Sequence, residues 1–535
     1  MVQSAYRRFN LDTWRSQSER ISMVMDPDCP LHVLEWVITL DTDTEVVLST
    51  LMNPSITDEL VDLIRTRYDL THEQMQRLRM SREQHDLKLK AFCATPWNHV
   101  ATTAEGKLRM CCQMINGGRF VAGESVGMLQ SDDGEFLTTE HDITVYRNAP
   151  AWKKIRAQML QGQRPEVCKL CWDEEDNGIG SRRQRVNGQY PYLFTHALAN
   201  TRADGSIEHQ QFPIAHLDLR FGNKCNLACR SCGPSNSDQW YRDWHGLHDR
   251  LEFGGDDDTE IRLFKDRDGK LKTKDSRYAW HEHSQLLAYI NDNLQDIDRL
   301  YFTGGEPTIS HTHRDLLDQI IATGHASRIT LEYNTNMAAV PPALFDKWKQ
   351  FKSIHLGMSL DGMGPQFEYI RHPGRWDAVL RNLRRLDTEP GLDHVQATVT
   401  MVVGVYNVLH LLDMLTWWQA QAWQRLDHDI IIHNLYGPVH LNAQNLPQRA
   451  KDAVTQRYLS YIEALRSLHG GDRQHYGLME DRLMGVLQHI NSQAGNPQHW
   501  RFFGEWTSRL DALRGEDWRV SLPELAQLLS SCDDV

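Results

Sequence analysis

The alternation of short apolar runs with amphipathic segments from residue 214 onward constrains the fold more than any other feature. Six runs have the length and composition of buried strands: IAHLDLR (214–220), IDRLYFT (297–303), RITLEYN (328–334), SIHLGMSL (353–360), HVQATVTMVV (394–403) and DIIIHNLY (429–436). Helix candidates lie between or after them, near 237–247, 313–323, 342–350, 374–387 and 406–422. Such alternation predicts an α/β fold with a largely parallel sheet, here a partial (β/α)6 TIM-type barrel over residues 211–446.

The composition is that of an ordinary globular protein. Of 535 residues, 40% are hydrophobic and 24% are charged, so the chain can bury a large core. A formal net charge of −13 disfavours nucleic acid and anionic membranes as partners. The N-terminus has no signal-peptide pattern, and the apolar stretch at 397–405 is too short to cross a bilayer. We therefore expect a cytoplasmic protein.

Three regions flank the predicted barrel. Residues 1–90 have helical patterns, for example at 56–68 and 71–80, but no motif that indicates a role. Residues 91–210 hold five of the ten cysteines among Gly and Asp clusters, which is typical of a small metal-stapled domain. Residues 447–535 form a mostly helical extension. The charged segment 253–275 is typical of an exposed insertion.

Three cysteines follow the first predicted strand: Cys225, Cys229 and Cys232. In parallel barrels the chemistry collects at the carboxyl ends of the strands, which is where this loop lies. Structural zinc usually takes four protein ligands, and no fourth cysteine is near, although spacing leaves His216 open as a ligand. A four-iron cluster held by three thiolates keeps one iron open. The alternatives are a zinc knuckle or simply buried thiols.

The CNLACRSC loop (225–232) resembles the signature of the radical S-adenosylmethionine (SAM) enzymes, apart from Ser231, where members usually carry an aromatic or apolar residue. The resemblance implies that Cys225, Cys229 and Cys232 hold a [4Fe-4S] cluster whose open iron is chelated by SAM. Reductive cleavage of SAM would then give a 5′-deoxyadenosyl radical that abstracts a substrate hydrogen. It also implies an electron donor such as flavodoxin or ferredoxin.

A Gly-Gly-Glu-Pro motif follows the second predicted strand. Gly304 and Gly305 let the backbone approach a ligand closely, and Glu306 can accept hydrogen bonds from an ammonium group. The motif resembles the Gly-Gly-Glu of the same family, which implies a contact from Glu306 to the SAM amino group. Read alone, it is an ordinary turn.

Polar residues also follow the third and fourth predicted strands. Asn336 ends the third run, and Ser359 and Asp361 lie where they can recognise hydroxyl groups. The resemblance implies that these residues help hold the SAM ribose, and that Arg371 meets the SAM carboxylate. The alternatives are a turn at Asp361 and a solvated arginine. Asn407 is a weaker candidate, since it can equally cap the next helix.

A second set of cysteines precedes the barrel: Cys93, Cys111, Cys168 and Cys171. Spacing alone fits zinc and an iron-sulfur cluster equally. The order of Cys93, Gly106 and Cys111 resembles the start of the SPASM and twitch auxiliary domains, which implies a second [4Fe-4S] cluster in a twitch-like domain N-terminal to the barrel. We favour Cys111 over Cys112 from its spacing to Gly106, and because successive side chains of an extended chain point apart.

Other residues around these cysteines have less defined meanings. Glu175, Gly178, Ser181 and Arg183 match a family pattern of unknown purpose, while Cys29 and Cys532 are expected to be ordinary thiols. Arg182, Arg183 and Arg185 suggest nucleic-acid modification only weakly, since the chain is acidic and arginines are often ion-pair partners.

The leading hypothesis is a radical SAM enzyme that modifies a peptide or protein side chain. The substrate rests on the resemblance, because auxiliary-cluster relatives often act on peptides. One alternative is a small metabolite such as a sugar, nucleoside or amino acid. Another is a zinc-stapled, non-catalytic binding protein.

Overall fold

The computed structural model describes residues 24, 29, 31–40, 44–53, 55–71, 75, 87, 90–114, 138–176, 180–248, 263–273, 276–282, 284–470 and 472–530. Its main feature is a sheet of eight strands in the order β10-β9-β8-β7-β6-β3-β1-β2. The strands are β1 (His99–Thr102), β2 (Leu108–Arg109), β3 (His216–Arg220), β6 (Arg299–Thr303), β7 (Thr330–Thr335), β8 (Ser353–Ser359), β9 (Val395–Val403) and β10 (Leu426–Asn434).

The six predicted strands are confirmed as β3, β6, β7, β8, β9 and β10, and all of them pair in parallel. Their order in the sheet follows their order in the chain, as repeated strand-helix-strand units require. Side chains alternate along each strand. On one face they are buried aliphatic and aromatic residues, and on the other they are mostly polar and partly exposed. In β8, for example, Ile354, Leu356 and Met358 are buried, and the residues that alternate with them are half-buried.

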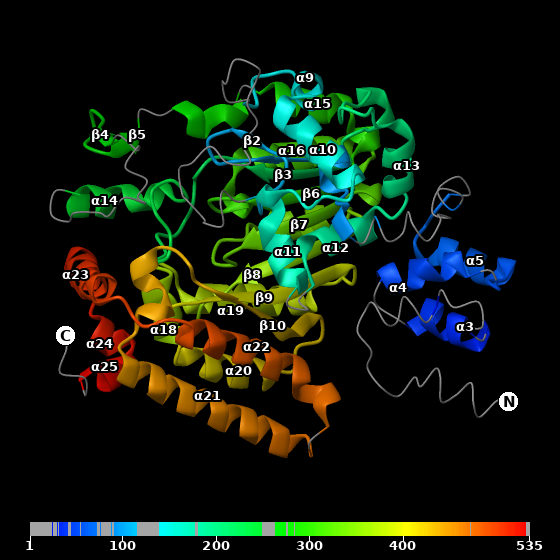
Figure 1. Cartoon of the computed structure of the whole chain (residues 1–535). Helices are drawn as coiled ribbons and strands as arrows, with labels where there is room; N and C mark the ends of the chain where they lie inside the picture. The colour runs from blue at the N-terminus through cyan, green and yellow to red at the C-terminus, as the bar shows by residue number, and fades with distance from the viewer. Residues whose placement is uncertain are drawn as a thin grey trace.

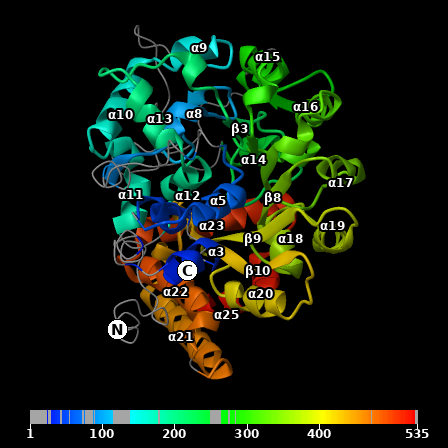
Figure 2. The same cartoon turned by 90° about the vertical axis from the view of Figure 1, so that its right-hand side faces the viewer.

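Helices cover the apolar face of this sheet. They are α15 (Gln285–Asp292), α16 (His311–Ala322), α17 (Pro342–Trp348), α19 (Trp376–Thr388) and α20 (His410–Gln419), and Figure 2 shows them following one another around the strands. Leu316 and Leu317 of α16 share one core with Phe302 of β6 and Leu331 of β7. Burial of this face accounts for the partial-barrel curvature, and we call the opposite face of the sheet the lumen face.

Strand β1 was not predicted, and it places part of the cysteine-rich region in the barrel sheet. It pairs in parallel with β3, from His99 opposite His216 to Ala101 opposite Asp218, and β2 pairs antiparallel with β1. The strand has only four residues, all buried, so its pattern is too short to signal a strand.

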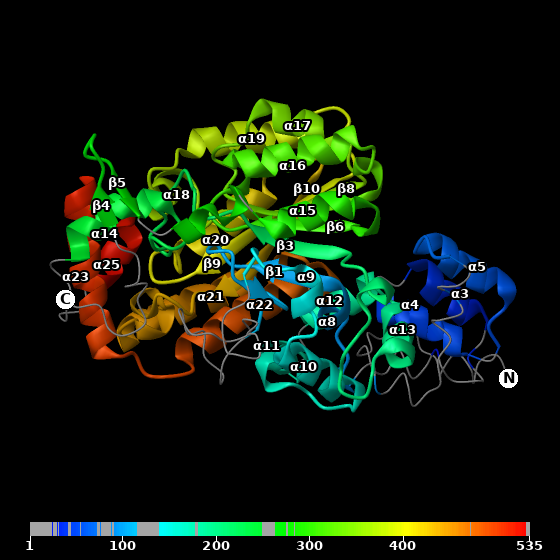
Figure 3. The same cartoon turned by 90° about the horizontal axis from the view of Figure 1, so that it is seen from above.

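Helices from the same region lie on the lumen side of the sheet. The helices α10 (Pro150–Leu160), α11 (Lys169–Asp176) and α12 (Arg182–Gln189) are labelled in Figure 1, and Figures 2 and 3 show them across the sheet from α15 and α16. Helix α12 begins at a capping box, in which Ser181 accepts from the Gln184 backbone N–H and the Gln184 side chain accepts from the Ser181 N–H. A helix α13 (Leu193–Asn200) leads on toward β3.

The described residues near both ends of the chain are mostly helical. Helices α3 (Leu31–Leu40), α4 (Thr44–Ser49) and α5 (Asp58–Arg67) share a small core of their own, which includes Cys29. Most of the pattern at 71–80 lies outside the described residues, as do Gly178 and Cys532. The C-terminal extension contains α21 (Gln448–Leu468), α22 (Arg473–Asn491), α23 (Pro497–Arg514), α24 (Trp518–Ser521) and α25 (Pro523–Ser530).

Two further elements were not predicted. The insertion contains a short hairpin of β4 (Leu263–Lys265) and β5 (Leu271–Thr273), and α18 (Gly364–Ile370) follows β8. Helix α14 (Tyr241–His248) matches the candidate near 237–247. No helix in the described part of the chain is both long and apolar enough to span a membrane.

Candidate functional site

The loop with Cys225, Cys229 and Cys232 leaves the carboxyl end of β3 and is held by backbone hydrogen bonds to later strands. The Ala228 N–H donates to the His372 carbonyl at 2.6 Å, and the Arg230 N–H donates to the Ile370 carbonyl at 2.8 Å. The loop is therefore fixed against the segment that follows α18.

The three thiols lie together in a site that is largely closed to water. Cys229 is buried, and Cys225 and Cys232 are half-buried. A hydrogen bond from the Cys232 thiol lowers the pKa of Cys229, and the charge of Arg371 adds to this effect. Burial raises the pKa of Cys225 to about 12, and the neighbouring Cys229 adds to this. Dry, closely spaced thiols favour a bound cation that compensates their charge.

His216, which the spacing left open as a fourth ligand of the three thiols, lies at the other end of β3. His216 starts β3, roughly 13 Å of strand away from Arg220 at its end, and stacks edge-to-face on His99 with a centroid distance of 4.5 Å. It is therefore no fourth ligand, and three thiols remain, as a four-iron cluster with one open iron requires.

Gly304 and Gly305 allow the cysteine loop to approach the mouth of β6. Their φ angles are +74° and +50°. A Cβ on Gly305 would lie 2.2 Å from the Lys224 carbonyl oxygen, and a Cβ on Gly304 would lie 2.9 Å from the Cβ of Arg220. The Glu306 N–H donates to the same Lys224 carbonyl at 2.9 Å. The sequence predicted that Gly304 and Gly305 let the backbone approach a ligand. In the structure these glycines instead let the backbone of β6 approach the cysteine loop.

Glu306 joins the mouths of β6 and β7 and is only 2% exposed. Its Oε1 accepts from the hydroxyls of Thr308 at 2.7 Å and Thr335 at 2.8 Å, and its Oε2 accepts from the Asn336 N–H at 2.8 Å. Burial raises the pKa of Glu306, and these hydrogen bonds oppose the rise. Asn336 also donates to Asn226 Oδ1 at 2.9 Å, which ties β7 to the cysteine loop.

Asp361 and Arg371 form an ion pair beside the thiols. Arg371 Nη2 lies 2.7 Å from Asp361 Oδ2, and Nη1 lies 3.8 Å from the Cys229 sulfur. Asp361 Oδ1 also accepts from the Val402 N–H, while Ser359 is half-buried at the end of β8. Asn407 donates to the Asp361 carbonyl at 3.0 Å and accepts from the Gly404 N–H at 2.8 Å, so it braces the turn after β9.

Sequence reasoning missed a contact between the cysteine loop and the C-terminal extension. Arg230 is fully buried, and it forms ion pairs with Asp511 and with Glu516, the latter at 2.6 Å. Its guanidinium stacks 3.6 Å from the Tyr369 ring centroid. Arg514 of α23 donates to the Ala228 carbonyl at 2.8 Å. We call these contacts the loop clamp. No local pattern could reveal it, because 281 residues separate Arg230 from Asp511.

The second set of cysteines also gathers in one place. Cys93 adds to the raised pKa of Cys168 and of Cys171 and opposes the lowered pKa of Cys111, so the four thiols lie near one another. For Cys168 and Cys171, burial is the larger cause, and it raises the pKa of Cys171 to about 12. Gly106 has a φ angle of +78° and packs against Trp280. A Cβ at this position would lie 2.6 Å from the Trp280 ring, so both the backbone conformation and the packing require glycine.

Residues of α11 and α12 hold the backbone around Cys93. Arg183 forms a buried ion pair with Glu175 and donates to the Phe92 carbonyl at 2.7 Å. Ser181 donates to Glu175 as well. Asn187 accepts from the Ala94 N–H at 2.9 Å and donates to the Phe92 carbonyl at 2.9 Å. The pattern of unknown purpose in the sequence is therefore a brace between the Cys168–Cys171 segment and Cys93.

Two expectations about this region need correction. Cys111 and Cys112 do not point apart, because the chain turns there, and a hydrogen bond from the Cys112 thiol lowers the pKa of Cys111. Arg182 and Arg183 are buried, and of the three arginines only Arg185 is exposed. Buried arginines offer no surface to a phosphate backbone, so the idea of nucleic-acid modification loses its basis.

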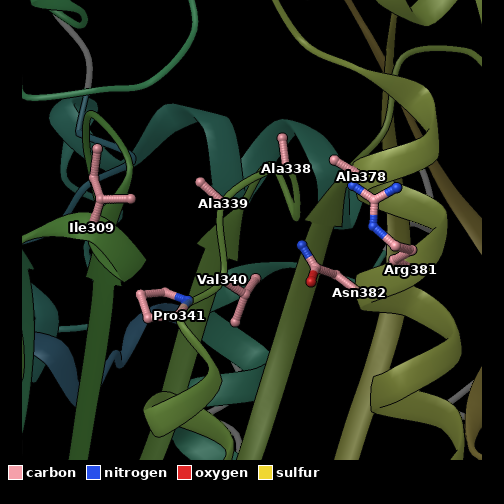
Figure 4. A pocket seen from close by; sticks show the side chains of 8 residues that line it. All are labelled: Ile309, Ala338, Ala339, Val340, Pro341, Ala378, Arg381 and Asn382. Atoms are coloured by element: carbon pink, nitrogen blue, oxygen red, sulfur yellow. The ribbon is translucent and has the colours of Figure 1, made fainter.

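Two surface cavities lie away from the thiols. One of about 360 Å³ is lined by residues 338–341, Ile309 and three α19 residues, including Arg381 and Asn382 (Figure 4). Another of about 380 Å³ lies between α18 and the C-terminal extension, and includes His372 and Glu516. Neither contains a predicted cysteine ligand, so neither replaces the strand mouths as the candidate site.

Residues 219–408 match the family model described as Radical SAM superfamily. Among solved structures, the chain is similar to anSMEcpe with bound AdoMet and the Cp18Cys peptide, at 14% identity and a TM-score of 0.30, over 48% of this chain and 61% of that chain. It is also similar to Streptococcus suis SuiB, at 13% identity and a TM-score of 0.30, over 64% and 66%. The chain thus spans less than two thirds of either structure. None of the curated proteins matches.

Proposed function

We propose that this chain is a radical SAM enzyme, because residues 219–408 match the model of the Radical SAM superfamily, and that its substrate is a peptide or protein side chain. The observation that carries the proposal is the placement of three half-buried or buried thiols at the mouth of a sheet with a polar, accessible lumen face. A [4Fe-4S] cluster bound there would supply the one-electron reduction of SAM that the family uses to start hydrogen abstraction.

The chain's own residues would bind and orient the cofactors. We assign Cys225, Cys229 and Cys232 to the [4Fe-4S] cluster, since the three thiols lie together on one loop at the mouth of β3. Glu306 Oε2 accepts a single N–H, from Asn336, and so keeps capacity for the SAM amino group. We assign Arg371, which pairs with Asp361, to the SAM carboxylate. We assign Asp361 and Ser359 to the SAM ribose.

The lumen face is accessible to solvent at β7. The Asn334 side chain is exposed, although its strand β7 lies between two paired strands, β6 and β8. Thr303, Gly357 and Thr398, at the same level of the neighbouring strands, are half-buried. A side chain on a central strand is exposed only where the space above it is accessible to water. Such a hollow suits a peptide side chain, and it also admits a small metabolite.

We assign Cys93, Cys111, Cys168 and Cys171 to an auxiliary [4Fe-4S] cluster of a twitch-like domain. Its support is the convergence of the four thiols and the brace from Arg183 and Asn187. A flavodoxin or ferredoxin would supply the electrons.

Metal analysis and mass spectrometry test this proposal. Anaerobically purified protein should contain about eight irons and acid-labile sulfide in two clusters, whereas zinc in place of iron would support a non-catalytic binding protein. Co-expression with a candidate precursor peptide should change the mass of that peptide, and Cys229→Ala should abolish the change. Turnover of a small metabolite with every peptide unaltered would contradict the peptide assignment.

A further inference from the structure

The turn between β8 and α18 carries two of the residues that we assign to SAM. Asp361 lies at the start of this turn, and Arg371 follows α18 directly, so a helix of seven residues joins the two groups. Their ion pair at 2.7 Å closes the segment into a loop. A shift at the start of α18 therefore displaces the Asp361–Arg371 pair as well.

His410 of α20 holds the start of α18. Its ring is buried, and its Nε2 accepts a hydrogen bond from the Met363 N–H at 3.2 Å. Met363 is the N-cap residue of α18, and the first N–H groups of a helix have no partner within the helix itself. A Cβ on Gly362 would lie 3.1 Å from Cδ2 of His410, so the ring also packs directly against the turn. His410 thus fixes the turn by a hydrogen bond and by packing.

The acceptor role assigns the proton of the neutral ring to the other nitrogen. Nε2 accepts from an N–H only when its lone pair is free, so the proton is on Nδ1. Nδ1 faces Asp413 of the same helix, at 3.5 Å from its Oδ2. Asp413 Oδ1 accepts from Arg457 of α21 at 3.2 Å, and Arg457 pairs with Glu524 of α25 at 2.5 Å. The imidazole and the C-terminal extension therefore share one carboxylate.

Protonation of the His410 ring would release the turn. An imidazolium carries an N–H on each nitrogen, so Nε2 would present a donor to the Met363 N–H. Two donors cannot form a hydrogen bond, and the Met363 N–H loses its acceptor. The neutral ring is therefore the form that holds the start of α18.

The surroundings of His410 keep the ring neutral at pH 7. Burial lowers the pKa of His410 below its ordinary value of 6.5, and the charge of Arg457 lowers it further. Asp413 and Glu524 oppose the shift without reversing it. On the side of α18, the carboxylate and the guanidinium that flank the helix are paired with each other. The hydrogen bond to the turn is therefore made at pH 7 and is lost as the ring is protonated at lower pH.

We propose that His410 is a positioning residue of the SAM site, which holds the start of α18 where Asp361 and Arg371 can meet SAM. This inference deepens the proposed function and rests on it, because the ligand of Asp361 and Arg371 is taken from there. His410 acts through the Met363 N–H rather than through contact with the cofactor. Its link to Arg457 and Glu524 ties the same turn to the C-terminal extension.

The test measures the Kd of SAM by equilibrium dialysis with anaerobic, iron-loaded protein. His410→Gln places an amide oxygen near Nε2 and keeps the acceptor for Met363, whereas His410→Asn places its amide near Nδ1 and keeps only the contact with Asp413. We expect the Asn variant to bind SAM about ten-fold more weakly, the order of one lost hydrogen bond, and the Gln variant to stay within about three-fold of the wild type. His428→Asn is the matched control, because His428 is an exposed histidine of β10, and it should bind SAM as the wild type does.

The pH dependence separates positioning from a merely structural role. As the pH falls from 8 to 5.5, the Kd of SAM should rise more for the wild type than for His410→Gln, because an amide does not titrate. Every other titrating group is common to both proteins, so the ratio of the two Kd values reports on His410 alone.

Three outcomes would overturn the positioning role of His410. They are an Asn variant that binds SAM as tightly as the wild type, a Gln variant that binds as weakly as the Asn variant, and a ratio of Kd values that is independent of pH. Wild-type protein that binds no SAM would overturn the proposed function, and this inference with it. Failure of the function is thus distinguished from failure of the positioning role, in which the wild type still binds SAM.

Discussion

The loop clamp gives a quantitative prediction, because it joins the cysteine loop to the C-terminal extension through buried charges. The Arg230 side chain is 0% exposed and that of Asp511 is 8% exposed. Asp511→Asn keeps the shape of the side chain but removes its charge. Breaking a buried ion pair by removing one partner costs about 3 to 5 kcal/mol, and Glu516 still offsets part of the charge, so we expect about 3 kcal/mol.

That loss should appear as faster release of iron from the cysteine loop. At 1.4 kcal/mol for each factor of ten, about 3 kcal/mol corresponds to an opening equilibrium roughly 100-fold more favourable. If iron leaves only from the opened loop, its anaerobic transfer to a chelator should accelerate by a similar factor. The assay follows the iron-chelator complex by absorbance, and electron paramagnetic resonance of the reduced protein identifies which cluster is lost.

A matched control comes from the same extension. Arg473 and Asp481 of α22 form an ion pair, and both side chains are 63% exposed. Exposed pairs contribute about 0 to 1 kcal/mol, so Asp481→Asn should leave iron release within a few-fold of the wild type. Iron release from Asp511→Asn that equals the control would refute the role of the clamp.

Three further predictions concern other parts of the molecule. Gly305→Ala should lose the iron held by Cys225, Cys229 and Cys232, because the added Cβ would clash with the Lys224 carbonyl oxygen. The control Gly485→Ala has open space around the added Cβ and should keep this iron. The iron content of both variants checks the prediction. Arg183→Met should remove only the auxiliary iron, about half of the total, because it breaks the contacts of Arg183 with Glu175 and the Phe92 carbonyl. The iron content per chain and the electron paramagnetic resonance spectrum of the reduced protein check this. Burial raises the pKa of Asp218 from its ordinary value of 3.8 to about 8 in the folded chain, so the stability that this proton contributes is lost as the pH rises from about 4 to 8. Asp218→Asn should therefore gain more Tm over the wild type at pH 8 than at pH 5, and an equal gain at both would contradict the shift.

The predictable part of this fold is the part that local patterns encode. The six barrel strands are Val-, Ile- and Leu-rich runs bounded by turn residues, and the Gly-Gly-Glu motif marks the mouth of β6 by its place after such a run. Because parallel strands end at one edge, sequence order alone brought the cysteine loop, Glu306 and Asp361 to the same region.

The parts that could not be predicted depend on contacts between distant segments. Strand β1 is only four residues long and becomes a strand because β3, more than a hundred residues later, offers a free edge. The loop clamp depends on an even longer separation.

Formation of 5′-deoxyadenosine is the measurement that tests the central claim most directly. Anaerobic, iron-replete protein reduced with dithionite should convert SAM to 5′-deoxyadenosine and methionine, detected by liquid chromatography and mass spectrometry. Variants with Cys225, Cys229 or Cys232 changed to Ala should give none, while Cys29→Ala, in the separate N-terminal core, should behave as the wild type. Iron-replete wild-type protein that forms no 5′-deoxyadenosine would contradict the account.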